Sequence, residues 1–210
     1  MPLKDELIKE IVCGYSHTLA INQFGQMYSW GNNENGQLGL GQDNVPVVVR
    51  KPILNQYVSN VVKLAAGHEH SLALTKSQDL YAWGAGALTG LAGDLKENAE
   101  TGECENVYLP TQLAFFKNHK IVQVACGGLH TIVLTQEGHL YSWGSTEGGQ
   151  LGLGGELREE TVLSPRLLEP LAAKLSEKKQ KVIQVSCGEA HSVALTDRGE
   201  VWGWGMSMYG

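Results

Sequence analysis

The chain has 210 residues, of which 42% are apolar and 18% charged, and its formal net charge is −6. This length suits one large domain or two small ones, and the acidic balance disfavours wide contact with nucleic acid, which depends on Lys and Arg. No apolar run reaches the ~18 residues needed to span a bilayer, the N-terminus lacks a signal-peptide pattern, and the four cysteines do not suggest a disulfide framework. We therefore expect no membrane association and a reducing compartment, the cytoplasm or the nucleus.

A core unit occurs four times along the chain. Each copy opens with a glycine, places a histidine three residues later and reaches a Trp-Gly pair at a constant distance from that histidine. The opening glycines are Gly14, Gly67, Gly127 and Gly188; the histidines are His17, His70, His130 and His191; the tryptophans are Trp30, Trp83, Trp143 and Trp204. The distance between successive copies varies, and this variation falls between the Trp-Gly pair and the next opening glycine. Loops tolerate insertions and paired strands do not, so a loop is predicted there.

Each copy predicts short β-strands in the same order. An apolar run precedes the opening glycine, as in "KIVQVACG" at 120–127. The next segment, "HTLAI" at 17–21 in the first copy, alternates larger and smaller side chains, which is typical of a strand. A short connector and the segment "MYSWG" at 27–31 complete a predicted hairpin.

Two further elements are predicted from the same pattern. A fourth strand is expected near Pro46, Pro110 or Pro165, which lie in the connection after the Trp-Gly pair. Residues 167–181 have Leu and Lys side chains at helical spacing and are the one segment for which a helix is predicted. Four-stranded units repeated at the spacing of these copies are typical of β-propeller blades.

The motif "CGYSHTLAINQFGQMYSWGNNENGQLGLG" at 13–41 and its counterpart at 126–154 resemble the repeat of the regulator of chromosome condensation family. The resemblance covers nearly the whole chain and implies a seven-bladed β-propeller. Its repeat cores span residues 13–41, 66–93, 126–154 and 187–210. The second core departs most, with Ala66 in place of cysteine and no Gly-Gln-Leu-Gly run. Four cores are too few for seven blades, so residues 1–210 are expected to form an all-β, incomplete propeller of three to four blades in an open arc.

The histidines allow two interpretations. One is a metal site built on Cys-x-x-x-His, as in Cys13 and His17. The other is a buried histidine in every blade, hydrogen-bonded to backbone. We favour the second, because the second copy has Ala66 where a ligand would stand and one pair supplies only two of the four ligands of a structural zinc site. We therefore predict no metal site, and we also predict no catalytic residue. No cofactor is predicted either, since "GQLGLG" lacks the strand, helix and lysine of a phosphate-binding loop.

Function is therefore expected in the unrepeated segments. Residues 85–109 form a candidate partner-binding loop, with the alternative that they are solvated surface. The acidic side chains of this loop are Asp94, Glu97, Glu100, Glu103 and Glu105. A basic segment, 166–181, is either a contact-making helical insert or a simple connection.

Two classes of function fit the resemblance. The first is a propeller that serves as a protein-interaction or regulatory module. The second, implied by the founding member of the family, is guanine-nucleotide exchange on a Ran-type small GTPase, and the sequence shows no loop that can be matched to an exchange element. Light sensing, which in this family uses tryptophans in the turn before the histidine, is disfavoured because the turns read "GYSH", "GHEH", "GGLH" and "GEAH".

Overall fold

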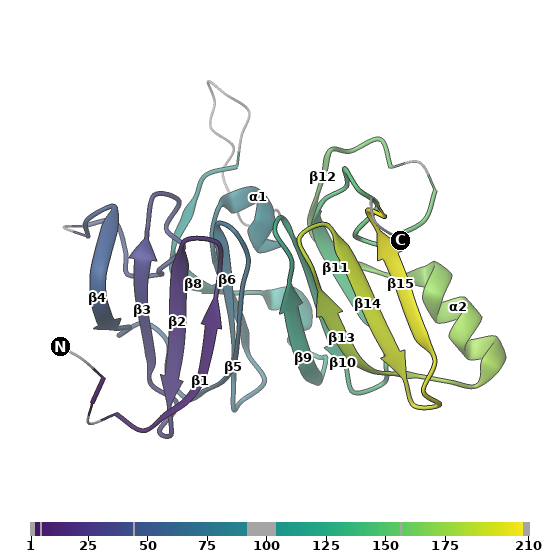
Figure 1. Cartoon of the computed structure of the whole chain (residues 1–210), viewed down its shortest axis with the longest axis horizontal. Helices are drawn as coiled ribbons and strands as arrows, with labels where there is room; N and C mark the ends of the chain where they lie inside the picture. Colours follow the sequence, from purple (N-terminus) through teal and green to yellow (C-terminus); the bar gives the residue numbers. More distant parts are fainter. Residues whose placement is uncertain (1–2, 5, 44, 92–103, 156, 208–210) are drawn as a thin grey trace.

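The computed structural model describes residues 3–4, 6–43, 45–91, 104–155 and 157–207. It contains four antiparallel sheets, each formed by strands that are consecutive in the chain (Figure 1). The first sheet comprises β1 (Ile8–Cys13), β2 (His17–Asn22), β3 (Met27–Asn32) and β4 (Val48–Leu54), and the second comprises β5 (Val61–Ala66), β6 (His70–Thr75), β7 (Leu80–Gly84) and β8 (Val107–Gln112). The third sheet comprises β9 (Ile121–Cys126), β10 (His130–Thr135), β11 (Leu140–Ser145) and β12 (Thr161–Leu167). The fourth sheet comprises β13 (Val182–Cys187), β14 (His191–Thr196) and β15 (Val201–Gly205). The expected strands are confirmed, including the fourth strands near the three prolines.

The strand register explains the constant spacing of the repeated residues. In every sheet the histidine at the start of the second strand pairs with the glycine of the Trp-Gly pair on the third strand. His17 pairs with Gly31, and the next residue, Thr18, pairs with Trp30. The distance from histidine to tryptophan is therefore the length of one hairpin, and an insertion would shift side chains to the wrong face.

The four sheets are the blades of an open propeller arc. The first strands of successive blades contact one another in chain order, from β1 through β5 and β9 to β13. The first and last blades stand at opposite ends of the row (Figure 1). The expectation of an all-β partial propeller is confirmed.

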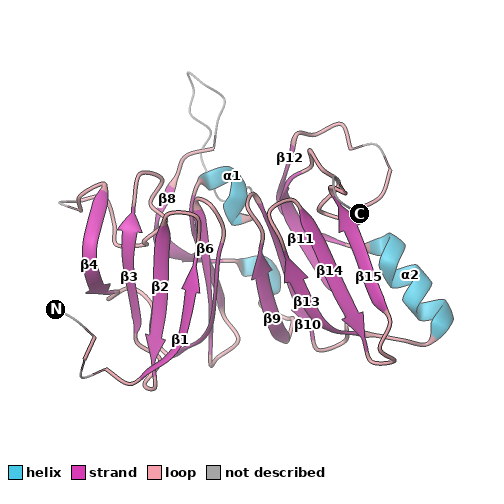
Figure 2. Ribbon diagram, viewed as in Figure 1, coloured by secondary structure: helices cyan, strands magenta, loops and turns pink. Residues whose placement is uncertain are grey.

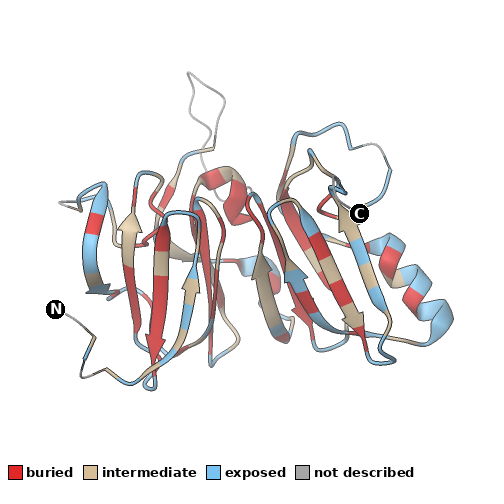
Figure 3. Cartoon of the chain, in the orientation of Figure 1, coloured by how far each residue is buried: buried red, intermediate tan, exposed pale blue. Residues whose placement is uncertain are grey.

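The core lies between the blades. Trp83, Trp143, Leu72 and Ile132 are completely buried, and Figure 3 shows the buried segments concentrated along the second strands, away from the outer edge strand β4. Apolar side chains from neighbouring sheets belong to the same core clusters and cover one another.

Within the described residues, three helical segments lie in connections between strands (Figure 2). Helix α2 (Glu169–Lys178) confirms the helix expected within 167–181 and packs Leu171 and Leu175 against the core of the last two blades. Helix α1 (Gly86–Thr89) and the short 3-10 helix Ala114–Phe116 were not expected from the sequence. No helix in the described segments is long and apolar enough to cross a membrane.

Antiparallel pairing gives every blade two different faces, one at each end of its strands. One end, here called the turn face, carries the turns 14–16, 67–69, 127–129 and 188–190 and the long connections β3–β4, β7–β8 and β11–β12 (top of Figure 1). The opposite end, the hairpin face, carries the tight β2–β3, β6–β7, β10–β11 and β14–β15 turns. The candidate loop 85–109 belongs to the turn face at both of its described ends.

Candidate interaction surface

The repeated histidines hold neighbouring blades together. His17 Nε2 lies 2.8 Å from Ser71 Oγ in the next blade, His70 Nε2 lies 2.9 Å from Thr131 Oγ1, and His130 Nε2 lies 2.8 Å from Ser192 Oγ. Ser71 Oγ donates to the Gln37 carbonyl at 2.8 Å, so it accepts the Nε2–H of His17. The expectation of hydrogen bonds to backbone was wrong, because the partners are side-chain hydroxyls in another blade.

Burial keeps these imidazoles neutral. Desolvation lowers the pKa of His17 and His130 to about 4, and desolvation together with neighbouring histidines lowers the pKa of His70 to about 3. His191 stands at the end of the arc, is exposed and makes no side-chain hydrogen bond within the described segments, so the expectation of a buried histidine in every blade was wrong for the last blade. The four equivalent histidines are thus alike in sequence and differ in structure according to whether another blade covers them.

The opening glycine of each turn is required by the histidine. A Cβ built on Gly14, Gly67, Gly127 or Gly188 would overlap the imidazole ring of the histidine three residues later. The Gly-x-x-His pattern is therefore a packing requirement, and the two intervening residues are left free to vary.

The tryptophans provide a second contact between blades. Trp83 Nε1 donates to the Gln37 carbonyl at 2.9 Å, and Trp204 Nε1 donates to the Gln150 carbonyl at 2.8 Å. In the divergent second copy the acceptor for Trp143 is the Leu88 carbonyl, at 3.0 Å, in helix α1. Trp30, at the first end of the arc, has no equivalent acceptor within the described residues and is half-buried. The repeated residues therefore serve blade-to-blade packing.

Two thiols beside the turns, those of Cys126 and Cys187, lie in environments that oppose ionisation. Burial raises the pKa of the Cys187 thiol to about 12 and raises that of Cys126 further. Within the described segments, no group of three His, Cys, Asp or Glu side chains is arranged to hold a metal ion.

Four of the five acidic side chains of the candidate loop lie outside the described residues. Asp94, Glu97, Glu100 and Glu103 lie outside the described residues, whereas Glu105 is exposed at the end of the loop. Its neighbour Asn106 donates from Nδ2 to Asn35 Oδ1 at 3.1 Å, which ties the end of this loop to the β3–β4 connection of the first blade.

A group that the sequence reasoning missed lies across the four turns of the turn face. The residue after each opening glycine is Tyr15, His68, Gly128 or Glu189. The Tyr15 and His68 rings are 4.8 Å apart, and His68 Nε2 lies 3.0 Å from both carboxylate oxygens of Glu189. A Cβ on Gly128 would lie 3.1 Å from His68 Nε2, so glycine leaves room for this pair to pass over the third turn.

One sequence signal could have identified this group. The position after the opening glycine holds four unrelated residues in copies that are otherwise similar. Blade packing does not fix this position, so its side chains can serve binding.

The exposed charge of the turn face is strongly acidic. Among the described residues, its turns and long connections carry eight exposed acidic side chains and one exposed basic side chain, Arg158. The acidic residues are Glu34, Asp43, Glu69, Glu105, Glu147, Glu159, Glu160 and Glu189. An electrostatic field of this sign attracts basic partners and repels nucleic acid.

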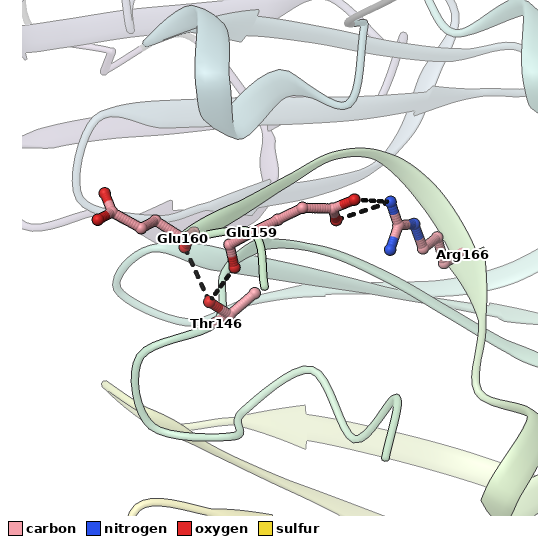
Figure 4. Close-up of polar contacts among 4 residues, drawn as sticks. All are labelled: Thr146, Glu159, Glu160 and Arg166. Carbon is pink, nitrogen blue, oxygen red and sulfur yellow. Dashed lines mark hydrogen bonds and ion pairs between the residues drawn. The ribbon is translucent and has the colours of Figure 1, made fainter. Parts of the chain in front are cut away.

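The β11–β12 connection is held in place at this face (Figure 4). Arg166 Nη2 lies 2.7 Å and 3.0 Å from the two carboxylate oxygens of Glu159. Thr146 Oγ1 donates to the carbonyls of Glu159 and Glu160, at 2.7 Å and 3.0 Å. Arg166 therefore offsets Glu159, and no ion pair is formed by Glu160 within the described segments.

Comparison with known proteins gives concordant results. The model of the Regulator of chromosome condensation (RCC1) repeat matches residues 25–74, 78–134 and 137–195, and a second model of this repeat matches 8–37, 121–150 and 182–210. The Ultraviolet-B receptor UVR8 of Arabidopsis thaliana is 36% identical over 204 residues, which are 97% of this chain and 42% of that protein. The RCC1-like G exchanging factor-like protein of Mus musculus is 33% identical over 208 residues, 98% of this chain and 42% of that protein.

A solved structure shares the fold and part of the sequence. Prp20p from Saccharomyces cerevisiae, described with its binding to Gsp1p and histones, superposes with a TM-score of 0.76 at 27% identity, over 96% of this chain and 46% of that one. The chain thus spans less than half the length of these relatives. The matched repeats cover most of its residues, and it belongs to the regulator of chromosome condensation (RCC1) repeat family.

Proposed function

We propose that this propeller is a protein-interaction module that binds its partner through the turn face. One observation carries the proposal: side chains that blade packing does not require, Tyr15, His68 and Glu189, meet on the same face as seven further exposed acids. The hairpin face, which besides its tight turns carries the β4–β5, β8–β9 and β12–β13 connections, has a mixture of charges. We also propose that the acidic segment 94–105 contributes to this contact, and that direct nucleic-acid binding and membrane association play no part in it.

The test compares matched variants of the two faces. The triple substitution Glu34→Lys, Glu69→Lys and Glu147→Lys reverses charge on the turn face, and Lys76→Glu, Lys117→Glu and Lys120→Glu does so on the hairpin face. Proteins captured from a cell lysate by the wild type should be lost with the first variant and retained with the second. Equal retention by both, with unchanged melting temperatures, would reject the turn face as the binding surface.

The acidic loop is tested separately. Charge reversal of Glu97, Glu100 and Glu103 should weaken capture and reduce its salt dependence while leaving stability nearly unchanged. Unchanged capture at low salt would mean that this loop is solvated surface.

Guanine-nucleotide exchange on a small GTPase is the second candidate. It is supported by the name of the mouse relative and by the binding of Prp20p to Gsp1p. Release of labelled GDP from a panel of small GTPases tests it directly. Acceleration of release from one GTPase, lost in the turn-face variant, would favour exchange, and no acceleration across the panel would reject it.

The cellular compartment is also a proposal. Cys13, Cys126 and Cys187 are free thiols, which fits the reducing cytoplasm or nucleus. Localisation of a fluorescently tagged protein decides between these two compartments and the mitochondrion, to which one relative, RUG3 of Arabidopsis thaliana, is assigned by name.

A further inference from the structure

The four turns of the turn face surround a hollow of about 280 Å³. Its walls are made of small residues, namely the four opening glycines, Gly128, Ala66 and three cysteines. Three larger side chains stand at its rim: Tyr15, His68 and Glu189. The small wall residues leave room for one long side chain, and the polar rim can contact its end.

The rim combines an aromatic ring with a carboxylate. Tyr15 is 79% exposed, so its ring lies open although one side contacts His68. The Glu189 side chain is 74% exposed and is oriented by His68 Nε2. Each carboxylate oxygen can accept more than one hydrogen bond, so Glu189 retains acceptor capacity for a ligand.

The charge around the hollow fixes the sign of the ligand. Glu69 is exposed in the second turn, and apart from His68 no basic side chain lies in the four turns. An ammonium or guanidinium group gains from a carboxylate and from the face of a tyrosine ring. An anionic side chain gains from neither, and an apolar side chain cannot use the carboxylate.

We propose that this hollow receives a single lysine or arginine side chain from a basic segment of the partner. The aliphatic part of that side chain lies along the glycine walls, its charged end contacts the Tyr15 ring, and Glu189 accepts its hydrogen bonds. His68 acts as a positioning residue for Glu189. This inference rests on the proposed binding through the turn face and names the chemistry of the partner there.

The experiment measures fluorescence anisotropy of labelled hexalysine and hexaarginine peptides with the full 210-residue chain, and hexaglutamine serves as the neutral peptide. Three variants separate the hollow from the general charge of the face. Glu189→Gln removes the carboxylate, Tyr15→Ala removes the ring without changing charge, and Glu147→Gln removes an equal charge outside the hollow.

We expect at least one basic peptide to bind and hexaglutamine not to bind. Glu189→Gln and Tyr15→Ala should each weaken binding by about tenfold, and Glu147→Gln by less than about twofold. Thermal melts confirm that all variants are folded. The Tyr15→Ala effect should persist at raised salt, because it does not depend on long-range charge.

Two outcomes would overturn the inference. If Glu147→Gln weakens binding as much as Glu189→Gln, or if Tyr15→Ala has no effect, the peptides sense only the charge of the face. If neither basic peptide binds, the ligand class is wrong. In both cases the lysate comparison of the two faces still decides the proposed function independently.

Discussion

The four equivalent histidines of the repeat fall into two settings, which differ in whether another blade covers the imidazole ring. His17, His70 and His130 each form a hydrogen bond with a hydroxyl of the next blade, whereas His191 is exposed at the end of the arc. A hydrogen bond between two buried groups adds little when formed, but a buried group left without its partner is strongly destabilising. The chain therefore contains its own control for the contribution of this contact.

Replacing His130 by Ala should lower the free energy of unfolding by roughly 1–3 kcal/mol, because Ser192 Oγ loses its donor and a cavity remains. His191→Ala, which removes an exposed ring, should change it by less than about 0.5 kcal/mol. Urea unfolding at neutral pH measures both. Equal effects of the two substitutions would contradict the role assigned to the interblade contact.

The buried histidines also predict the pH dependence of stability. Their pKa values are lowered to about 4, 3 and 4, below the ordinary value of 6.5. Between these limits the unfolded chain binds protons that the folded chain does not bind, so stability is lost as pH falls below about 6.5. The loss between pH 7 and pH 5 should be roughly 1–2 kcal/mol for each histidine.

Urea unfolding at several pH values from 7.5 to 5 checks this, with His70→Gln as the comparison. The variant should lose less stability across that range than the wild type, because one titrating group is gone. Carboxyl groups with a lowered pKa, such as Glu200 beside Lys178, act only below their ordinary value of 4.5 and do not affect this window. Stability that stays constant or rises toward pH 5 would show that the histidines do not remain neutral.

At the scale of the element, strands and hairpins were predictable and the contacts of the loops were not. The alternation in "HTLAI" and the helical spacing in 167–181 are local signals, and both elements formed as expected. Helix α1 is four residues long, too short to leave a periodic pattern. Its Leu88 carbonyl accepts the Trp143 indole of the next blade, a contact that no local rule specifies.

The Gly-Gln-Leu-Gly loop allows the backbone and packing effects of glycine to be separated. Gly39 has a φ of +65°, and a Cβ there would lie 2.9 Å from the Trp83 indole nitrogen. Gly155 has a φ of +68° and nothing within 4 Å of such a Cβ. Gly155→Ala should therefore cost about 1–2 kcal/mol for the left-handed backbone alone.

Gly39→Ala should cost a further 1–3 kcal/mol, roughly, because the added methyl group displaces the Trp83 ring. Urea unfolding of the two variants under identical conditions gives the difference. A Gly39→Ala variant no less stable than Gly155→Ala would mean that Trp83 does not pack as tightly against this loop as the structure indicates.

For the whole molecule, repetition made the architecture predictable from the sequence. Four copies of one unit indicate blades, and their number indicates an incomplete ring. The candidate site was much harder to predict from the sequence, because it depends on contacts between turns that lie far apart in the chain, such as those of Tyr15 and Glu189. The unrepeated acidic loop is recognisable in the sequence, whereas the group formed by Tyr15, His68 and Glu189 exists only because the blades stand side by side.

The two ends of the arc present the unmatched halves of the interblade contact. At the last blade, a hollow of about 540 Å³ is lined by His191, Val193, Trp204 and Met206. Val193 is half-buried, although its counterparts Leu19, Leu72 and Ile132 are completely buried beneath the neighbouring blade. At the first blade, Thr18 stands where the other blades accept a histidine. Uncovered apolar surface and a free strand edge favour association with further chain.

We therefore predict that the 210-residue chain self-associates at micromolar concentration and that extending it by further repeats raises its stability, because each added interface buries another blade face. Sedimentation velocity should show larger species whose share grows with concentration. Val193→Lys places a charge in the uncovered face and should shift the protein toward monomer, whereas Val122→Lys, an exposed position on β9, should not. A clean monomer that melts cooperatively above the extended protein would show that the end faces need no cover, and the association predicted from them would be wrong.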